Sequence, residues 1–200
     1  MISSLKVLLF FITGILIGIF FSLPNLLTSD KFLLYVLYTL ILFVGISIGA
    51  SFSFLEIIKK IKISEIFFPF GVAIFSILGG MLSSIFLNDI SIYDGASISA
   101  GFGYYSLSSV LITEIKGEYL GTIALLSNII REIFTFLVSA LIVKKFYPLS
   151  PIALGGATSM DTTMPVILKY SGKEFVLLSI YNGIVLSSLV PILIPIILNF

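Results

Sequence analysis

The chain has 200 residues, of which 58% are hydrophobic, and it carries only 11 Lys or Arg and 10 Asp or Glu residues. A soluble domain needs more polar surface than this composition provides, so we expect the lipid bilayer to be the solvent for most of the chain. The net charge of +1 gives no basic face for nucleic acid, and without His or Cys the chain lacks imidazole and thiolate metal ligands. We therefore expect no metal, no cofactor and no nucleic-acid partner.

Five apolar runs are each long enough to cross a membrane as a helix, which takes about 20 residues. They lie at about 5–23, 32–50, 66–87, 119–143 and 175–199. Because they follow one another along the whole chain, we expect an all-α integral membrane protein of about five transmembrane helices. It forms a single membrane domain with no soluble domain attached.

Two further segments, at about 95–115 and 149–168, are moderately apolar but crowded with Gly, Ser and Thr. We expect both to be broken or re-entrant, and the choice between re-entry and full crossing stays open. Backbone that leaves helical geometry at membrane depth is tolerated only where protein or a water-filled cavity satisfies it. The two segments therefore indicate a shared polar cavity. On this basis 1–94 is a three-helix N-terminal segment and 95–200 is a transport core.

A faint internal repeat relates the two halves of this core. Gly95-Ala96-Ser97, a broken segment and a helix that carries Asn128 resemble Gly156-Ala157-Thr158, a broken segment and a helix that carries Asn182. With one crossing in each unit the two copies would be inverted, which is a common architecture of secondary transporters.

The distribution of Lys between the loops predicts the orientation, because cytoplasmic loops carry more positive charge. If both broken segments re-enter, Lys6, Lys59, Lys60, Lys62, Lys144, Lys145, Lys169 and Lys173 lie inside, against Lys31 and Lys116 outside. If both segments cross fully, Lys144 and Lys145 move outside and Lys116 moves inside. The count of lysines then changes from eight inside and two outside to seven inside and three outside. Both versions put the N-terminus in the cytoplasm and the C-terminus outside the inner or plasma membrane.

A polar stripe lies at the centre of the predicted helix at 119–143. Ser127, Asn128, Arg131 and Glu132 follow one another at helical spacing. A charge at mid-membrane costs about 3 kcal/mol on insertion scales, so Arg131 and Glu132 should face a cavity or a partner. The alternative is a structural ion pair that holds helices together. Adjacent side chains point about 100° apart, so each of the two charges should have its own partner.

The second broken segment adds a carboxylate to the predicted cavity. Asp161 follows Thr158 and Ser159 there, while Tyr104 and Tyr105 in the first broken segment are further candidates to line the cavity. The alternatives are an Asp that caps a half-helix and tyrosines at the membrane interface. A substrate with two amino groups and a carboxylate would use Glu132 and Asp161 for its cations. Arg131 or the N-terminus of a half-helix would bind its anion.

Four separated motifs resemble the LysO-type lysine exporter family. They are Gly101-Phe102-Gly103-Tyr104-Tyr105-Ser106-Leu107-Ser108, Asn128-x-x-Arg131-Glu132, Gly156-Ala157-Thr158-Ser159-Met160-Asp161 with Pro165-Val166, and Leu186-Ser187-x-Leu189-Val190-Pro191. The likeness is dense from about residue 95 onward. It implies a secondary transporter of the inner membrane, not an enzyme, that exports L-lysine and toxic lysine analogues and is coupled to an ion gradient. It also implies that Glu132 and Asp161 are the functional carboxylates.

The chain departs from this family at its N-terminus. Full-length members carry a further block of about three helices, and this chain resembles only their C-terminal two-thirds. Either the block is a separate polypeptide, or a minimal form works alone or as a homo-oligomer. We therefore expect L-lysine as substrate, and as partner a second copy or a small membrane protein that supplies the block.

Other classes of membrane protein fit the pattern less well. The main alternative is a non-transporting scaffold or a subunit of a larger transporter, whose polar stripe only docks helices. An intramembrane aspartyl protease needs two paired Asp residues, and Asp161 is the only one at plausible depth. A channel would need a filter ring, and the sequence shows none.

Overall fold

The computed structural model describes residues 2–20 and 63–199, together with Pro24 and isolated positions between 32 and 46. The regular elements within these residues are all helices, as the sequence predicted. The predicted helix at 32–50 is described only at those isolated positions. Lys31 and the cluster Lys59, Lys60 and Lys62 lie outside the described residues.

Four described helices match the predicted apolar runs to within a few residues. They are α1 (Ile2–Phe20), α5 (Phe68–Ser84), α8 (Glu118–Lys145) and α11 (Val176–Leu198). The shorter elements are α4 (Ile63–Ile66), α6 (Ile92–Ser99), α7 (Tyr105–Lys116), α9 (Ser150–Gly155), η1 (Gly156–Met160), α10 (Met164–Tyr170) and η2 (Lys173–Phe175). The two Gly-, Ser- and Thr-rich segments are thus interrupted helices.

Two of the described helices are long and apolar enough to cross a membrane, Glu118–Lys145 and Lys173–Leu198. Only 28% and 44% of their most apolar stretches are buried. The core helix of a soluble protein would be mostly buried, so these exposed apolar faces are suited to lipid. The third apolar helix, α5, has 17 residues. The total of about five spans stays a prediction.

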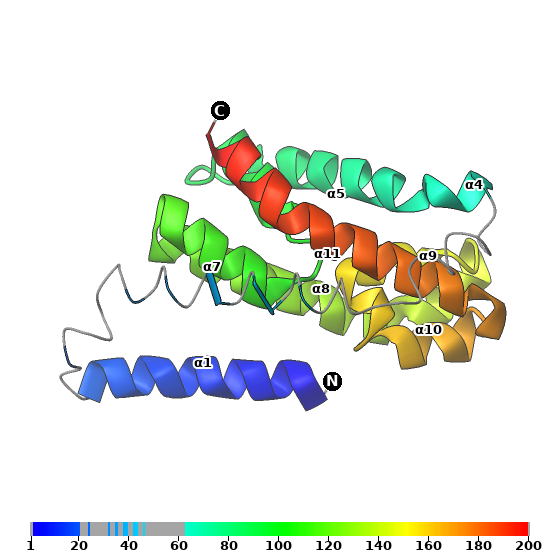
Figure 1. The fold of residues 1–200 in the computed structure, drawn as a ribbon, viewed down its shortest axis with the longest axis horizontal. Coiled ribbons are helices and arrows are strands. Elements are labelled where there is room, and N and C mark those ends of the chain that lie inside the picture. The colour runs from blue at the N-terminus through cyan, green and yellow to red at the C-terminus, as the bar shows by residue number, and fades with distance from the viewer. Residues whose placement is uncertain are drawn as a thin grey trace.

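The first hairpin consists of α6 and α7. α7 packs along the N-terminal half of α8 (Figure 1), whereas α6 packs chiefly on α5. α6 begins at a capping box in which Ser91 and Asp94 bond each other's backbone amides. At its other end the Ile98 carbonyl accepts from Asn128, in the middle of α8. α7 then returns, and Thr113 packs closely against Gly121 near the start of α8. Ile90, just before α6, borders a small cavity together with Ile123 in the second turn of α8, so both ends of the first hairpin lie toward the N-terminal end of α8.

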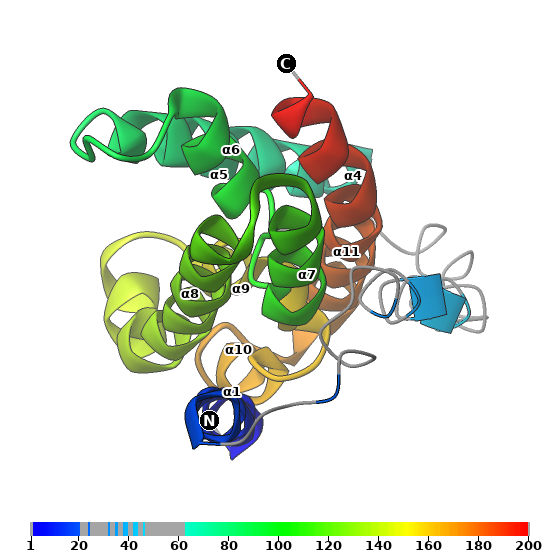
Figure 2. The same cartoon turned by 90° about the vertical axis from the view of Figure 1, so that its left-hand side faces the viewer.

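The second hairpin consists of α9, η1 and α10, and it enters from the opposite end of α8. The Leu154 carbonyl at the end of α9 accepts from Arg131, which places the tip beside the middle of α8. α10 returns from this tip, so that its Ile167 packs with Ile152 of α9 and Leu178 near the start of α11. Seen from the end where α11 finishes, α7 lies between α8 and α11 (Figure 2).

The two hairpin tips meet each other at mid-helix depth. The Ala157 amide donates to the Phe102 carbonyl over 2.8 Å. Gly103 and Gly156 have φ angles of 94° and 60°, in the left-handed region that glycine adopts at little cost. A Cβ on Gly156 would also lie 2.3 Å from the Phe102 carbonyl oxygen. The glycines thus allow the chain to turn back and the tips to approach.

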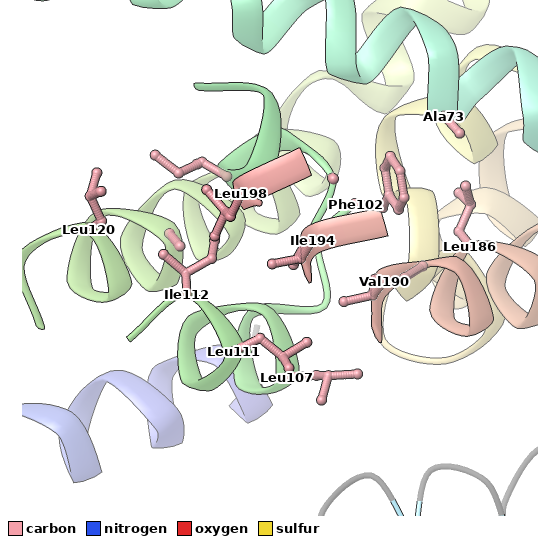
Figure 3. Packing of buried hydrophobic residues seen from close by; sticks show 14 of the residues in the cluster. Ala73, Phe102, Leu107, Leu111, Ile112, Leu120, Leu186, Val190, Ile194 and Leu198 are labelled. Carbon is pink, nitrogen blue, oxygen red and sulfur yellow. The ribbon is translucent and has the colours of Figure 1, made fainter. Parts of the chain in front are cut away.

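A single apolar cluster joins the first hairpin to α11 (Figure 3). Its fully buried members include Phe102, Leu107 and Ile112 from the first hairpin and its tip, and Leu186 and Val190 from α11. In a bilayer such side chains are held by close van der Waals packing, because the lipid tails they would otherwise meet are equally apolar. The packing fixes the tip of the first hairpin against the centre of α11.

Candidate functional site

Glu132 lies near the centre of α8 with its side chain fully buried. Neither of its carboxylate oxygens has a hydrogen-bond partner among the described residues. An ionised carboxylate at such a position is very costly unless a cation accompanies it. The arrangement therefore suits a group that binds a proton or a cationic ligand.

A cavity of about 180 Å³ lies between the two hairpin tips and α11. It is lined by Tyr104, Ala157, Thr158, Met160, Asp161 and Ser187. The carboxylate of Asp161 is exposed, and its Oδ1 accepts from the Thr162 amide. The structure thus places three predicted site residues, Tyr104, Thr158 and Asp161, around one space.

Glu132 and Tyr105 lie close to this cavity. The carboxylates of Glu132 and Asp161 are near enough to interact electrostatically, and Tyr105 interacts with both. Two acidic groups from different elements therefore share one region of the protein. Among the described residues no group of three acidic side chains is placed to hold a metal ion.

Ser187 of α11 is a site residue that the sequence analysis did not select. It is 1% exposed, it lines the cavity, and its hydroxyl has no hydrogen-bond partner among the described residues. Serines in membrane helices commonly donate to a carbonyl of their own helix, as the neighbouring Ser188 does to Ile184 over 2.8 Å. The Ser187 hydroxyl is instead available to a ligand.

Asn128 uses its amide to hold the tip of the first hairpin. Its Oδ1 accepts from the Gly103 amide over 2.7 Å, and its Nδ2 donates to the carbonyls of Ile98 and Ala124. Its side chain is 3% exposed. Asn182 of α11 has a similar place at the other tip, where it donates to the carbonyls of Gly156 and Ile152.

Arg131 points away from the cavity between the tips. Its guanidinium donates to the carbonyls of Leu154 and Ala153 over 2.8 and 3.0 Å, and to the Ser76 hydroxyl over 3.1 Å. A cation is favourable at the C-terminal end of a helix, and here Arg131 binds the last turn of α9. Its partners are therefore carbonyls and a hydroxyl of the protein, and Arg131 and Glu132 do not pair.

Ser159 fastens η1 to α11. Its hydroxyl donates to the Ser179 carbonyl over 2.8 Å, while the Ser179 hydroxyl donates back to the Ser159 carbonyl over 2.6 Å. Thr158 bonds the Gly155 carbonyl from within the same segment. The second tip is thus held to α11, as the first is held to α8.

A family model described as Lysine exporter LysO matches residues 8–198. The chain belongs to this lysine exporter family. Such a family consists of transporters, which agrees with the resemblance inferred from the four motifs.

Two relatives support the assignment to the lysine exporters. A Haemophilus influenzae protein named “Putative lysine exporter” is 38% identical over 166 residues, which cover 80% of each chain. The Escherichia coli protein named Lysine exporter LysO is 36% identical over 123 residues, 62% of this chain. The chain thus matches about 40% of the length of the E. coli protein. No solved structure matches the chain.

Within this member of the lysine exporter family, the predicted site residues fall into two groups. Tyr104, Thr158 and Asp161 line the cavity, and Tyr105 and Glu132 lie close to it. Asn128, Arg131 and Ser159 bond the backbone of the hairpins. Ser187 completes the first group. The sequence signal for Ser187 was weak: it is a hydroxyl within the apolar run at 175–199, in one of the four family motifs.

Proposed function

We propose that this chain is a secondary transporter that exports L-lysine and its toxic analogues from the cytoplasm, coupled to an ion gradient. The observation that carries the proposal is the buried carboxylate of Glu132, which lies close to Asp161. This carboxylate has no hydrogen-bond partner among the described residues. Lysine carries two ammonium groups, and the region offers two carboxylates. Membership of the lysine exporter family supports the same substrate.

In this mechanism Glu132 and Asp161 alternately hold the ammonium groups of lysine and exchanged protons. A buried carboxylate is stable when it carries a proton or pairs with a cation, and unstable when it is ionised and alone. Loading of lysine would therefore release protons from the site, and departure of lysine would allow protons to bind again. With no His in the chain, carboxylates are the simplest proton carriers.

We propose that the two hairpins are re-entrant segments of an inverted repeat. α8 and α11 run in opposite directions (Figure 1), and Asn128 and Asn182 each donate to a carbonyl 30 residues earlier, Ile98 and Ile152. Lys116 ends α7, directly before α8 begins, whereas Lys144 lies in the last turn of α8 and Lys173 begins η2, directly before α11. This arrangement fits about five spans with the N-terminus inside and the C-terminus outside.

In the same proposal Asn128, Arg131 and Ser159 are positioning residues. Each donates to, or accepts from, backbone at or beside a hairpin tip. They would keep the two tips in the geometry that brings the carboxylates together. Among the described residues, the carboxylate at the centre of α8 has no partner, and a scaffold would have no need for such a group. This favours transport over that alternative.

The amide variants Glu132→Gln and Asp161→Asn test this role. They keep the size of the side chain and its hydrogen bonding but remove its charge, and they lower the cost of insertion into the membrane. We expect both variants to reach the membrane in normal amounts and to fail to protect cells against excess lysine. Growth at increasing lysine concentration, with membrane protein measured by immunoblot, provides the readout.

Glu114→Gln and Glu118→Gln are matched controls, because both carboxylates are exposed at the far end of the first hairpin and the start of α8. We expect them to retain most of the protection. If both site variants protect cells as well as the parent does, the carboxylate mechanism is wrong and the polar stripe is structural.

A further inference from the structure

The exported substrate requires a binding partner for its α-carboxylate. Arg131 is the obvious cation, but its guanidinium is already bonded to two carbonyls of α9 and to Ser76, and it does not line the cavity between the tips. Arg131 instead borders a separate cavity of about 580 Å³, so a carboxylate held in the cavity between the tips would bind to neutral donors.

The first turn of α7 supplies such donors. Tyr104 precedes this 12-residue helix and lines the cavity. The amides of Ser106 and Leu107 have no hydrogen-bond partner within the described residues, whereas Tyr105 and Ser108 bond to Gly103 and Tyr104. Free amides and the helix dipole together favour an anion at a helix N-terminus.

Ser187 is a second and independent pointer to a ligand. The residue is 1% exposed, it lines the same cavity from α11, and its hydroxyl has no partner among the described residues. Hydroxyls donate readily to carboxylates, and such charge-assisted bonds are stronger than neutral ones. Asp161 does not use these donors, since its bonded amide is that of Thr162.

We propose that the N-terminus of α7 and the Ser187 hydroxyl bind the α-carboxylate of the exported amino acid, while Asp161 binds its α-ammonium group. The two groups are attached to one carbon, and all three protein elements border one cavity of about 180 Å³. Glu132 does not line the cavity itself. Its carboxylate would bind the ammonium group at the end of the substrate's side chain. This inference rests on the proposed function. It defines the substrate class as α-amino acids with a cationic side chain, in preference to simple diamines.

The variant Ser187→Ala tests this carboxylate subsite, with Ser188→Ala as its matched control. The Ser188 hydroxyl is bonded within its own helix, so its loss removes no ligand contact. Each purified protein is titrated in detergent with L-lysine and with 1,5-diaminopentane, which is lysine without the carboxylate. The readout is the ratio of the two dissociation constants, which is insensitive to general damage.

We expect the parent and Ser188→Ala to bind lysine at least about tenfold more tightly than 1,5-diaminopentane. Ser187→Ala should reduce this preference by about tenfold through weaker lysine binding, with diamine binding unchanged. A parent without the preference, or a Ser187→Ala protein that keeps it, would overturn the subsite. Lysine binding of the expected kind without lysine flux in vesicles would overturn the export function and leave the subsite intact.

Discussion

Gly156 shows how much of the site depends on single residues. Its φ of 60° is strained for any residue with a Cβ, and such an atom would lie 2.3 Å from the Phe102 carbonyl oxygen. We expect Gly156→Ala to destabilise the protein by about 2 kcal/mol or more, because left-handed backbone alone costs about 1–2 kcal/mol and the tips must also separate. Thermal unfolding in detergent measures the loss.

Gly71→Ala is the control for this change. Gly71 lies in α5, and a Cβ built on it meets no atom within 4 Å. Alanine is the better helix former, so this variant should unfold at or slightly above the temperature of the parent. Equal unfolding temperatures for Gly156→Ala and Gly71→Ala would contradict the close approach of the tips.

At the residue scale, the sequence predicted which side chains carry charge at depth but not which of them face each other. Glu132 and Asp161 could be selected because charges at mid-membrane are costly. The partners of Arg131 could not be predicted, since Ser76 and Leu154 are 55 and 23 residues away along the chain. Ser187 could not be selected either, because a lone hydroxyl in an apolar helix is common and has no periodic signal.

At the element scale, composition predicted where the helices break, whereas hydrogen bonds across the chain determine where they turn. Gly, Ser and Thr mark both interruptions. α6 and α7 have 8 and 12 residues, so in line with each other they would be about long enough to cross a bilayer. The bond from Asn128 to Ile98 places the end of α6 at the middle of α8, while Ile90 before α6 borders the same small cavity as Ile123 in the second turn of α8. α7 then returns to the start of α8, where Thr113 lies against Gly121, so the segment folds back.

Cysteine labelling tests the proposed re-entry, and the chain has no native Cys to interfere. If the first hairpin is re-entrant, Asp89→Cys and Lys116→Cys should both react with an impermeant maleimide from outside. Lys145→Cys and Lys173→Cys, which flank the second hairpin, should react only from the cytoplasm. Labelling of positions 89 and 116 from opposite sides would show that the first segment crosses fully.

At the scale of the whole molecule, α1 leaves much apolar surface uncovered. Side chains such as Phe10, Ile19 and Phe20 are between 69% and 79% exposed, and nothing lies within 4 Å of a Cβ built on Gly14 or Gly18. Helices with small residues at this spacing commonly pack against another helix in the bilayer. We therefore expect a second copy, or a small membrane partner, to complete the transporter. A monodisperse monomer that transports at full rate when reconstituted alone would contradict this expectation.

The central claim is that two carboxylates at the meeting of the hairpins carry lysine across the membrane. Counterflow of radiolabelled L-lysine into vesicles preloaded with unlabelled L-lysine tests it most directly. We expect label to accumulate with the parent and with Glu118→Gln, and to stay at the level of protein-free vesicles with Glu132→Gln and Asp161→Asn. Accumulation by both amide variants at the rate of the parent, or none by a parent that still binds lysine, would contradict the claim.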